Sequence, residues 1–591
     1  MTEPISIANC SGFYGDLHDA PRLLLEGPDR IDVLTGDYLA ELTMLILWKA
    51  KRKDPSAGYA KTFLAQMDEV LETILDRGIS VVVNAGGLNP RSLADALRSL
   101  AKKLGRTVNI AVVEGDNLID DVPRLLAEGI KFTNLDTGLP FSSTDAEALS
   151  ANAYLGGFGI AAAMQRGAQI VITGRVTDAA LVIGPAAFHH GWASDDFDAL
   201  AGALVAGHLI ECGTQVTGGN YALFHELPDL HFPGFPIAEV ANDGSCVITK
   251  QPGSGGLVSV GTVTAQLLYE IGDERYENPD VVADFSTVEL HQLGPDRVQV
   301  STVKGYAPSG KLKVALNYEG GYRNQMSVIL TGLDLHDKAR RVRTMLFDLL
   351  GGEDQFDEVT VELVSGTTID APTNEAATGR LRIVVKGQDE HLVGRKFSQA
   401  VVALTLASVP GFFADTPPTG ASTYGVYWPA LIDDSVVEHS VVLEGGEEIV
   451  IPRAPVTADL PLRKSDPETQ DLLGEPTTLA ILGDLCGARS GDKGGNANVG
   501  IWTTDDEIFD WMVRALDVDT VAELLGVDVE VEVRRTVLSN VLAINYVVVG
   551  ILGEGVASST RLDPQGKGLG EYLRSRMVDV PISLLSKLRQ P

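Results

Sequence analysis

The 591-residue sequence has very few cysteines, and this scarcity argues against several kinds of fold and site. No C-x-x-C pair and no zinc-finger spacing occurs, and the H-E-x-x-H pattern of many zinc enzymes is also missing. We therefore expect no disulfide framework and no bound metal, and a reducing compartment fits best. The four cysteines are Cys10, Cys212, Cys246 and Cys486.

Positive charge is the second deficit, because 47 Lys and Arg stand against 80 Asp and Glu, for a net charge of −33. Binding to phosphates or to anionic lipids needs clustered basic side chains, so neither nucleic acid nor a membrane surface is an expected partner. The most apolar segment, residues 541–552, is shorter than the ~20 residues that span a bilayer. Residues 1–9 show no signal-peptide pattern. We therefore expect a cytoplasmic protein.

Residues 1–212 alternate short apolar runs with amphipathic stretches. Apolar runs of this length are typical of strands buried on both faces of a parallel sheet. This order predicts an α/β domain with a parallel sheet. The expected strands are residues 31–34, 79–83, 108–113 and 170–172, and the expected helices are 39–50, 61–77 and 91–104.

The rest of the chain has a different pattern. Residues 213–451 contain many short alternating segments between glycines and prolines, which predicts a mixed, mostly antiparallel α+β region. A proline-rich, charged stretch at 452–475 is typical of a linker. The order of elements over 476–591 predicts a small ferredoxin-like α/β sandwich. Specific expectations are strands at 258–263, 298–303, 311–317, 529–536 and 541–549, and helices at 335–350, 506–525 and 565–577.

The carboxyl ends of the predicted parallel strands are where a ligand is expected, because ligands in such sheets gather there. Each of these loops combines glycine with a carboxylate, an amide or a guanidinium group, although any one of them could be an ordinary turn or helix cap. Taken together they favour a binding site. The loops are residues 35–38, 84–90, 114–117 and 173–178, joined by 11–16.

Arg175 is the candidate for an anion contact, because its planar guanidinium suits a carboxylate or a phosphate. An ion pair with Asp178 or Asp116 is the alternative, and it is compatible with binding. Acid–base catalysis needs carboxyl groups in different environments, and helix capping or Mg²⁺ coordination are alternative roles for such groups. The catalytic candidates are Asp37, Glu114, Asp116 and Asp178.

Further candidates for substrate contacts come from the glycine-bearing turns and from residues 487–496, which could form an anion-binding nest of backbone N–H groups or an ordinary wide loop. They are Gly12, Tyr14, Asp16, Gly36, Tyr38, Asn84, Gly86, Gly87, Thr217, Gly218, Ser490, Lys493 and Asn496.

Two tempting motifs do not meet their structural requirements. Residues 208–221 bring a His, a Glu and Cys212 together, but an isolated cysteine is more often a small buried apolar residue than a nucleophile. Residues 157–162 resemble a dinucleotide-binding fingerprint, which needs a strand before it. The preceding residues 144–154 are predicted to be helical, so we reject that function.

Several of these segments together resemble the acyclic terpene utilisation (AtuA) family. The resemblance covers nearly the whole chain and is weakest between about residues 340 and 477. Residues 488–494 and 561–567 are similar to the ferredoxin-fold domain found in many members. The other matching segments are 11–16, 36–41, 84–90, 114–116, 174–178, 211–213, 217–219, 234–239 and 267–270.

The resemblance implies a part in bacterial breakdown of acyclic terpenes, beside acyl-CoA carboxylases and hydratases. It implies an enzyme that acts on branched acyl-CoA thioesters by hydration, dehydration or carbon–carbon cleavage, with the CoA thioester as substrate and no cofactor predicted. Mg²⁺ has no specific support. The alternative is a non-catalytic partner of a biotin-dependent acyl-CoA carboxylase or a hydratase. A symmetric homo-oligomer is expected in either case.

Overall fold

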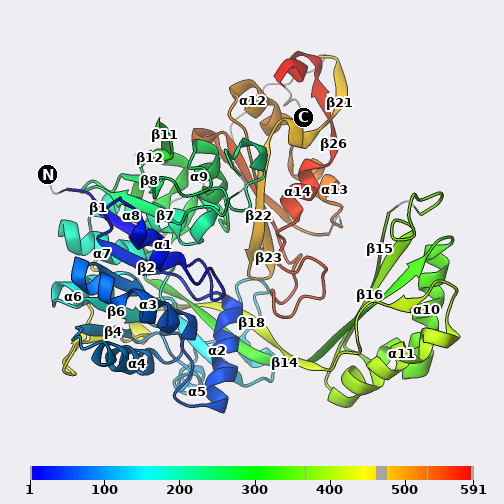
Figure 1. Ribbon diagram of the computed structural model, residues 1–591, viewed down its shortest axis with the longest axis horizontal. Coiled ribbons are helices and arrows are strands. Elements are labelled where there is room, and N and C mark those ends of the chain that lie inside the picture. Colours follow the sequence, from blue (N-terminus) through cyan, green and yellow to red (C-terminus); the bar gives the residue numbers. More distant parts are fainter. Residues whose placement is uncertain (1–2, 230, 367, 461–474, 529, 588–591) are drawn as a thin grey trace. The chain divides into compact units, whose positions relative to one another are not determined.

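The computed structural model describes residues 3–229, 231–366, 368–460, 475–528 and 530–587 (Figure 1). Its chain forms two compact units. Unit 1 comprises Met1–Leu316, Trp428–Val556 and Gln565–Pro591, and unit 2 comprises Asn317–Tyr427 and Ala557–Pro564. Most of the expected linker, residues 461–474, lies outside the described residues.

An eleven-stranded sheet organises unit 1, and its central strands are parallel as the sequence predicts. In spatial order these are β1 (Ile5–Asn9), β2 (Val33–Gly36), β3 (Ser80–Val83), β6 (Ile170–Thr173) and β4 (Ile110–Glu114). Antiparallel strands extend both sides of this parallel part, so the whole sheet is mixed. They are β7 (Pro236–Val240), β8 (Cys246–Lys250), β12 (Arg297–Ser301) and β11 (Glu289–Gly294) beside β1, and β19 (Ser440–Val442) and β20 (Glu448–Val450) beside β4.

Helices cover both faces of the parallel strands, which explains why those strands are apolar throughout. One face packs against α1 (Ala20–Glu26), α3 (Lys61–Arg77) and α4 (Pro90–Lys103). The other face is covered by α6 (Phe158–Gln165), α7 (Ala180–His190) and α8 (Phe197–Ile210), and nearly all of α8 is buried. Predicted helices over α2 (Glu41–Lys53), α3 and α4 are confirmed within a few residues.

Two segments of unit 1 adopt a different structure from the predicted one. Residues 144–154 were expected to be helical, but they contain strand β5 (Ala148–Ala153), which pairs with β14 (Lys311–Thr331). Residues 258–263 were expected to form a strand, but helix α9 (Val260–Leu267) begins there, because the Ser259 hydroxyl accepts a hydrogen bond from the Thr262 N–H. Long-range strand pairing and local capping override the apolar periodicity in these two segments.

The C-terminal part of unit 1 contains a four-stranded antiparallel sheet with helices, in line with the predicted small sandwich. The predicted helix over 506–525 is two helices, because Leu516 ends the first and the Asp517 carboxylate caps the second through the Thr520 N–H. In spatial order the strands are β22 (Gly487–Lys493), β23 (Asn496–Trp502), β25 (Ala543–Val548) and β24 (Val533–Leu538); the helices are α12 (Asp506–Ala515), α13 (Val518–Leu525) and α14 (Leu569–Arg574).

Smaller elements complete unit 1. A two-stranded sheet consists of β21 (Thr477–Ile481) and β26 (Met577–Pro581). A three-stranded sheet has the order β13 (Lys304–Tyr306), β10 (Val282–Asp284) and β9 (Arg275–Glu277).

Unit 2 is built on antiparallel pairing, as predicted for this part of the chain. Strands β14 and β18 (Ser422–Asp433) each run across the boundary between the two units. Helix α10 (Leu335–Leu350) is confirmed, whereas α11 (Phe397–Ala407) was not predicted. The strands β15 (Glu358–Ser365), β16 (Thr378–Gly387) and β17 (Phe413–Ala414) complete the sheet.

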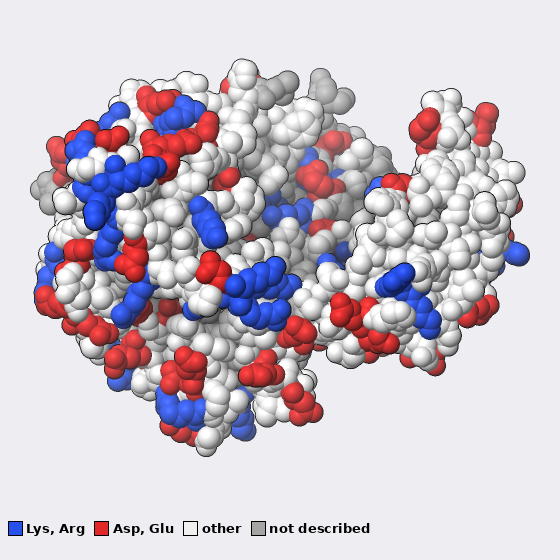
Figure 2. Space-filling view, turned by 60° about the horizontal axis from the view of Figure 1, so that its bottom comes forward, with Lys and Arg blue, Asp and Glu red and all other residues white. Residues whose placement is uncertain are grey.

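Among the helices of the described residues, none is both long and apolar enough to cross a bilayer. On the face drawn in Figure 2, basic side chains lie beside acidic ones, within a chain of net charge −33.

Candidate functional site

Several buried polar and charged side chains of unit 1 lie at the carboxyl ends of the parallel strands. Asp37 follows β2, Asn84 follows β3, and Arg175 and Asp178 follow β6. The first loop of the chain joins them, because the Asp37 N–H donates to the carbonyl of Ser11 over 2.9 Å. The structure therefore brings these predicted segments together at one edge of the parallel strands.

Asp37 is an acidic group in a nearly dry setting, with a relative exposure of 6%. Its Oδ1 accepts hydrogen bonds from Asn84 Nδ2, at 2.5 Å, and from the Leu39 N–H, at 3.1 Å. Burial raises the pKa of Asp37 well above its ordinary value, and the negative charge of Asp178 raises it further. Asn84 also accepts from the Tyr38 N–H, so its amide fixes the loop that carries Asp37.

Arg175 lies inside the protein and pairs with Asp178, as the alternative interpretation of the sequence had it. Its Nη1 donates to Oδ1 of Asp178 and to the carbonyl of Val176, and its guanidinium carbon lies 4.0 Å from the centre of the Tyr154 ring. The Asp178 side chain is 28% exposed, against 5% for that of Arg175. Asp178 is thus the member of this pair that reaches solvent.

Asp116 and Glu114, the other two predicted catalytic residues, have different surroundings. Asp116 is buried, and its Oδ2 accepts from the Arg175 N–H and from Asn152 Nδ2, both at 2.8 Å. Burial raises the pKa of Asp116 to about 6. Glu114 lies at the surface, where it pairs with Arg91 at 2.5 Å. Asp116 therefore braces the end of β6, and Glu114 stays outside the buried cluster.

The pair of His208 and Glu211 was not among the predicted site residues. Both belong to the end of α8 and are buried, with relative exposures of 0% and 7%. His208 Nδ1 lies 3.2 Å from Glu211 Oε1, and His208 Nε2 lies 3.2 Å from the Leu267 carbonyl oxygen. Burial lowers the pKa of His208 to about 4. Burial, together with the charges of Asp178 and Glu270, raises the pKa of Glu211 well above its ordinary value.

Two buried polar atoms around this pair make no hydrogen bond within the described part of the chain. They are Oε2 of Glu211 and Oε1 of Gln266. Unsatisfied polar atoms are rare in folded proteins and are often found at functional sites. Cys212 lies next to them, and its pKa is raised well above the ordinary value by burial and by the charges of Glu211 and Glu270, which opposes a role as a thiolate nucleophile.

The C-terminal sheet contributes basic side chains to the same place. Arg489 lies 4.3 Å from the centre of the Tyr269 ring and donates to Gln215, and Lys493 Nζ donates to the carbonyl of Glu270 over 2.7 Å. The charge of Lys493 also acts on Glu211, where it lowers the pKa against the larger effect of burial. The N-terminal and C-terminal parts of unit 1 therefore form one charged cluster.

Two buried amides attach the C-terminal sheet to the loop that carries Glu270. Asn498 donates to the Leu268 carbonyl over 2.7 Å and accepts from the Glu270 N–H over 2.9 Å. Asn545 donates to the carbonyls of Ile271 and Gly272. Glu270 has a positive φ of 59°, a conformation that costs a non-glycine residue on the order of 1–3 kcal/mol and persists only where its surroundings hold it.

Several predicted contact residues have structural partners. Tyr38 is buried and donates to Gln66 at 2.5 Å, and Asp16 accepts from the N–H groups of Gly12 and Leu17. A side chain at Gly12 would strike the backbone of Cys212, at 2.6 Å. Tyr14 packs against the core, Gly36 against Tyr38, Gly86 against the Thr173 carbonyl, and Gly87 against Leu47.

The remaining predicted contacts also hold loops in place. Thr217 donates to the carbonyls of Gly234 and Thr214, and Gly218 packs against Leu227 with a φ of 110°. Ser490 accepts from the Gly570 N–H at the start of α14. Asn496 donates to Asp136 over 2.7 Å. The sequence indicates that these residues form turns. It does not show whether a residue of this kind holds a loop in place or contacts a ligand.

We next consider whether side chains of the described residues could coordinate a metal ion. No three His, Cys, Asp or Glu side chains there are arranged to hold a metal ion. The acidic cluster also contains the basic side chains of Arg175, Arg489 and Lys493, and burial raises the pKa of Asp37 and Glu211 within it.

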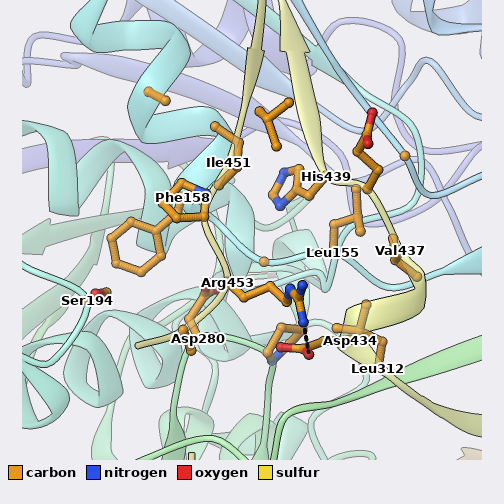
Figure 3. Close-up of a pocket in the computed structure, with 18 of the residues that line it drawn as sticks. Leu155, Phe158, Ser194, Asp280, Leu312, Asp434, Val437, His439, Ile451 and Arg453 are labelled. Carbon is orange, nitrogen blue, oxygen red and sulfur yellow. Dashed lines mark ion pairs between the residues drawn. The ribbon is translucent and has the colours of Figure 1, made fainter. Parts of the chain in front are cut away.

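A cavity of unit 1 lies apart from this cluster, on the other side of the segment after β5. Tyr154 contacts Arg175, whereas the next residue, Leu155, lines the cavity. The cavity has a volume of about 1230 Å³ and is bounded by α6, the end of α7 and the chain around β19 and β20 (Figure 3). Local sequence patterns do not indicate this cavity, because its walls come from segments far apart in the chain.

Comparison with known proteins identifies the family. The model of the acyclic terpene utilisation family protein AtuA matches residues 5–443, and that of the AtuA ferredoxin-like domain matches residues 480–579. No curated protein and no solved structure shows significant similarity to the chain. Because the first match alone covers well over half of the sequence, the chain belongs to the acyclic terpene utilisation family.

Proposed function

We propose that the charged cluster of unit 1 is the active site of an enzyme that adds water to, or removes it from, branched acyl-CoA thioesters. The observation that carries this proposal is the contrast between neighbouring carboxyl groups. Asp178 is paired with a guanidinium and reaches solvent, whereas Asp37 and Glu211 are buried with raised pKa values. Separated carboxyl environments of this kind are typical of acid–base catalysis.

Asp178 is the group that touches the substrate in this proposal. In dehydration, its carboxylate takes a proton from the carbon next to the thioester carbonyl. It then gives that proton to the departing hydroxyl group, which leaves as water while the carbon–carbon double bond forms. The reverse sequence hydrates the double bond. Arg175 holds the Asp178 carboxylate in position through their hydrogen bond, and Asp116 in turn holds the Arg175 backbone.

Glu211 has a positioning role, because it is buried and close enough to Asp178 for the charge of Asp178 to raise its pKa. Its protonated form adds no negative charge beside the reacting carboxylate. Loss of that proton at high pH would place a second carboxylate next to Asp178 and oppose the build-up of negative charge on the substrate. Lys493 and Arg489 supply positive charge for the anionic CoA portion, in a chain whose overall charge is −33.

The experiment is a comparison of Asp178→Asn and Glu114→Gln on a panel of branched enoyl-CoA and 3-hydroxyacyl-CoA thioesters, with products identified by mass spectrometry. Glu114→Gln is the matched control, because this carboxylate pairs with Arg91 outside the cluster. General acid–base groups contribute about 10²–10⁴-fold to rates, so Asp178→Asn should lose at least 100-fold in turnover. Glu114→Gln should remain within about twofold of wild type, because surface substitutions away from the site have small effects.

The pH–rate profile tests the role of Glu211 separately. The Glu211→Gln variant should lose the fall in rate that the wild type shows at alkaline pH. Wild-type turnover in Asp178→Asn would contradict the proposal, and so would a wild-type protein inactive on every thioester of the panel. In the second case, co-purification of an acyl-CoA carboxylase or hydratase would favour the alternative role as a partner protein.

A further inference from the structure

The cavity beside α6 is lined by both apolar and polar side chains. Its apolar side chains come from several separate segments of unit 1, and the charged side chains at its mouth, except for the exposed Glu438, are each in an ion pair. The main apolar residues are Leu155, Phe158, Phe188, Trp192, Leu312 and Ile451. Figure 3 shows Asp280 and His439 among the labelled residues that line it.

Asp280 places a buried carboxylate in this wall. Its relative exposure is 6%, and its Oδ2 accepts a hydrogen bond from the Gly157 N–H, over 2.8 Å, at the start of α6. No Lys, Arg or His side chain in the described part of the chain forms an ion pair with it. The positive end of the short helix offsets only part of a full negative charge.

The carboxylate is charged at neutral pH in spite of its burial. Burial raises the pKa of Asp280 to about 6, which still leaves most molecules ionised at pH 7.5. Burying an ionised carboxylate without a counter-charge is costly, and proteins usually pair such a group or bind it to a cation. Asp280 therefore has unused capacity for a positive partner.

The other charged and titratable groups of the cavity do not supply that partner. Arg453 lies 3.9 Å from Asp434, Lys311 pairs with Asp433 at 3.0 Å, and Arg124 pairs with Asp121 at 2.8 Å. These six side chains are partly or largely exposed. They lie at the mouth, and their charges are balanced locally.

His439 is not a cation at neutral pH either. Burial lowers the pKa of His439 to about 4, so its imidazole is neutral at pH 7.5. Its Nε2 lies against α6, where a side chain at Gly159 would approach it to 2.3 Å, and makes no hydrogen bond in the described residues. Glu438, a further carboxylate that lines the cavity, is exposed to solvent, so the buried charge of the cavity that has no counter-charge is the carboxylate of Asp280.

We propose that this cavity binds a small molecule that carries an ammonium group on an apolar body, with the ammonium group on Asp280. The ammonium group would supply the missing counter-charge, and the aromatic rings of Phe158, Phe188 and Trp192 would contact its apolar part. Aromatic faces attract cations as well as apolar groups. The net charge of −33 raises the local concentration of cations around the protein.

A carboxylate or phosphate ligand fits this cavity less well. It would face the charge of Asp280, and the basic side chains at the mouth already have acidic partners. An uncharged alcohol would satisfy a hydrogen bond of Asp280 but leave its charge uncompensated. Ligands that differ only in the head group, which is an ammonium, a hydroxyl or a carboxylate group, can therefore distinguish these three classes.

The test uses three probes with the same six-carbon chain: hexylammonium, hexan-1-ol and hexanoate. Binding of each to the full-length protein is measured by isothermal titration calorimetry at pH 7.5 and fixed ionic strength. We expect hexylammonium to bind saturably at one site and at least tenfold more tightly than the other two. Hexan-1-ol or hexanoate binding as tightly as hexylammonium would overturn the proposal.

Two substitutions locate the binding and separate it from general attraction of cations. Asp280→Asn keeps an oxygen to accept from Gly157 N–H but removes the charge, and it should weaken hexylammonium binding at least tenfold. Asp434→Asn removes one negative charge at the mouth and should change binding by less than threefold. Unchanged binding in Asp280→Asn, or equal weakening in both variants, would overturn the proposal.

Folding of the variants is checked by the melting temperature, which Asp280→Asn should raise because a buried charge is removed. The Asp178→Asn variant should bind hexylammonium as the wild type does. The proposal for this cavity and the proposal for the active site can therefore be contradicted independently of each other.

Discussion

Oε1 of Glu211 lies 3.2 Å from Nδ1 of His208, and both side chains are buried at the end of α8. The other ring nitrogen, Nε2, faces the carbonyl oxygen of Leu267, which can only accept a hydrogen bond. Nε2 therefore carries the proton, and Nδ1 offers a lone pair toward Glu211. A protonated Glu211 and a neutral His208 satisfy this arrangement, in agreement with the raised pKa of Glu211 and the lowered pKa of His208.

The first prediction concerns Glu211 and alkaline pH. Because its pKa is raised in the folded state, the unfolded chain releases this proton at a lower pH, and the free energy of unfolding falls as pH rises toward the folded pKa. Glu211→Gln removes this titration, so its melting temperature should fall less than that of wild type between pH 6 and pH 9. Glu114→Gln is the control. Equal slopes in wild type and Glu211→Gln would show that Glu211 is ionised in the folded protein.

The second prediction concerns His208 and acid. Burial lowers the pKa of His208 to about 4, so the unfolded chain takes up a proton below about pH 6.5 that the folded chain does not. The free energy of unfolding should therefore drop by roughly 3 kcal/mol between pH 6.5 and pH 4 on account of this residue alone. His208→Gln should show a correspondingly shallower loss in melting temperature over that range.

The matched control is His225→Gln, which changes an exposed histidine of the same unit. It should keep the acid slope of the wild type. A wild-type slope in His208→Gln would mean that the His208 imidazole is protonated in the fold, and that the neutral pair with Glu211 is wrong.

The third prediction tests whether Asp116 stabilises the end of β6 through its hydrogen bonds. Asp116→Ala leaves two buried donors, the Arg175 N–H and Asn152 Nδ2, without an acceptor, at about 1–3 kcal/mol each. Asp116→Asn keeps an acceptor oxygen and removes a buried charge. Denaturant unfolding should therefore find the alanine variant destabilised by roughly 2–6 kcal/mol and the asparagine variant close to wild type or more stable. Equal stability of the two variants would contradict the bracing role.

The local pattern of the sequence was enough to predict the parallel strands and most of the helices around them. Helices α3 and α10 begin and end where apolar periodicity and the flanking glycines indicate. The pattern failed where a distant partner decides the structure. Residues 148–153 look helical by themselves but form a strand because they pair with β14.

The candidate site was predictable only in part, for a similar reason. Asp37 and Arg175 stand at strand ends, so the rule for parallel sheets places them together. Glu211 lies at the end of a helix, and Lys493 is more than two hundred residues further along the chain, so only the tertiary fold shows that they meet. The proton state of Glu211 was equally hidden, since it depends on burial and on the charges of Asp178 and Glu270.

The fourth prediction concerns the contact between the C-terminal sheet and the site. Gly491 in β22 lies against Tyr269, and an added Cβ there would come within 2.2 Å of its ring. Gly491→Ala should therefore displace Tyr269, which stacks on Arg489, and overpacking of this kind typically costs about 1–3 kcal/mol. Gly294→Ala is the matched control, because no atom lies within 4 Å of its added Cβ. Thermal unfolding should show a lower melting temperature for Gly491→Ala alone, together with reduced turnover of any thioester the wild type converts. If both variants matched the wild type, the C-terminal sheet would not pack on the Tyr269 loop in solution, and Lys493 and Arg489 would have no place in the active site.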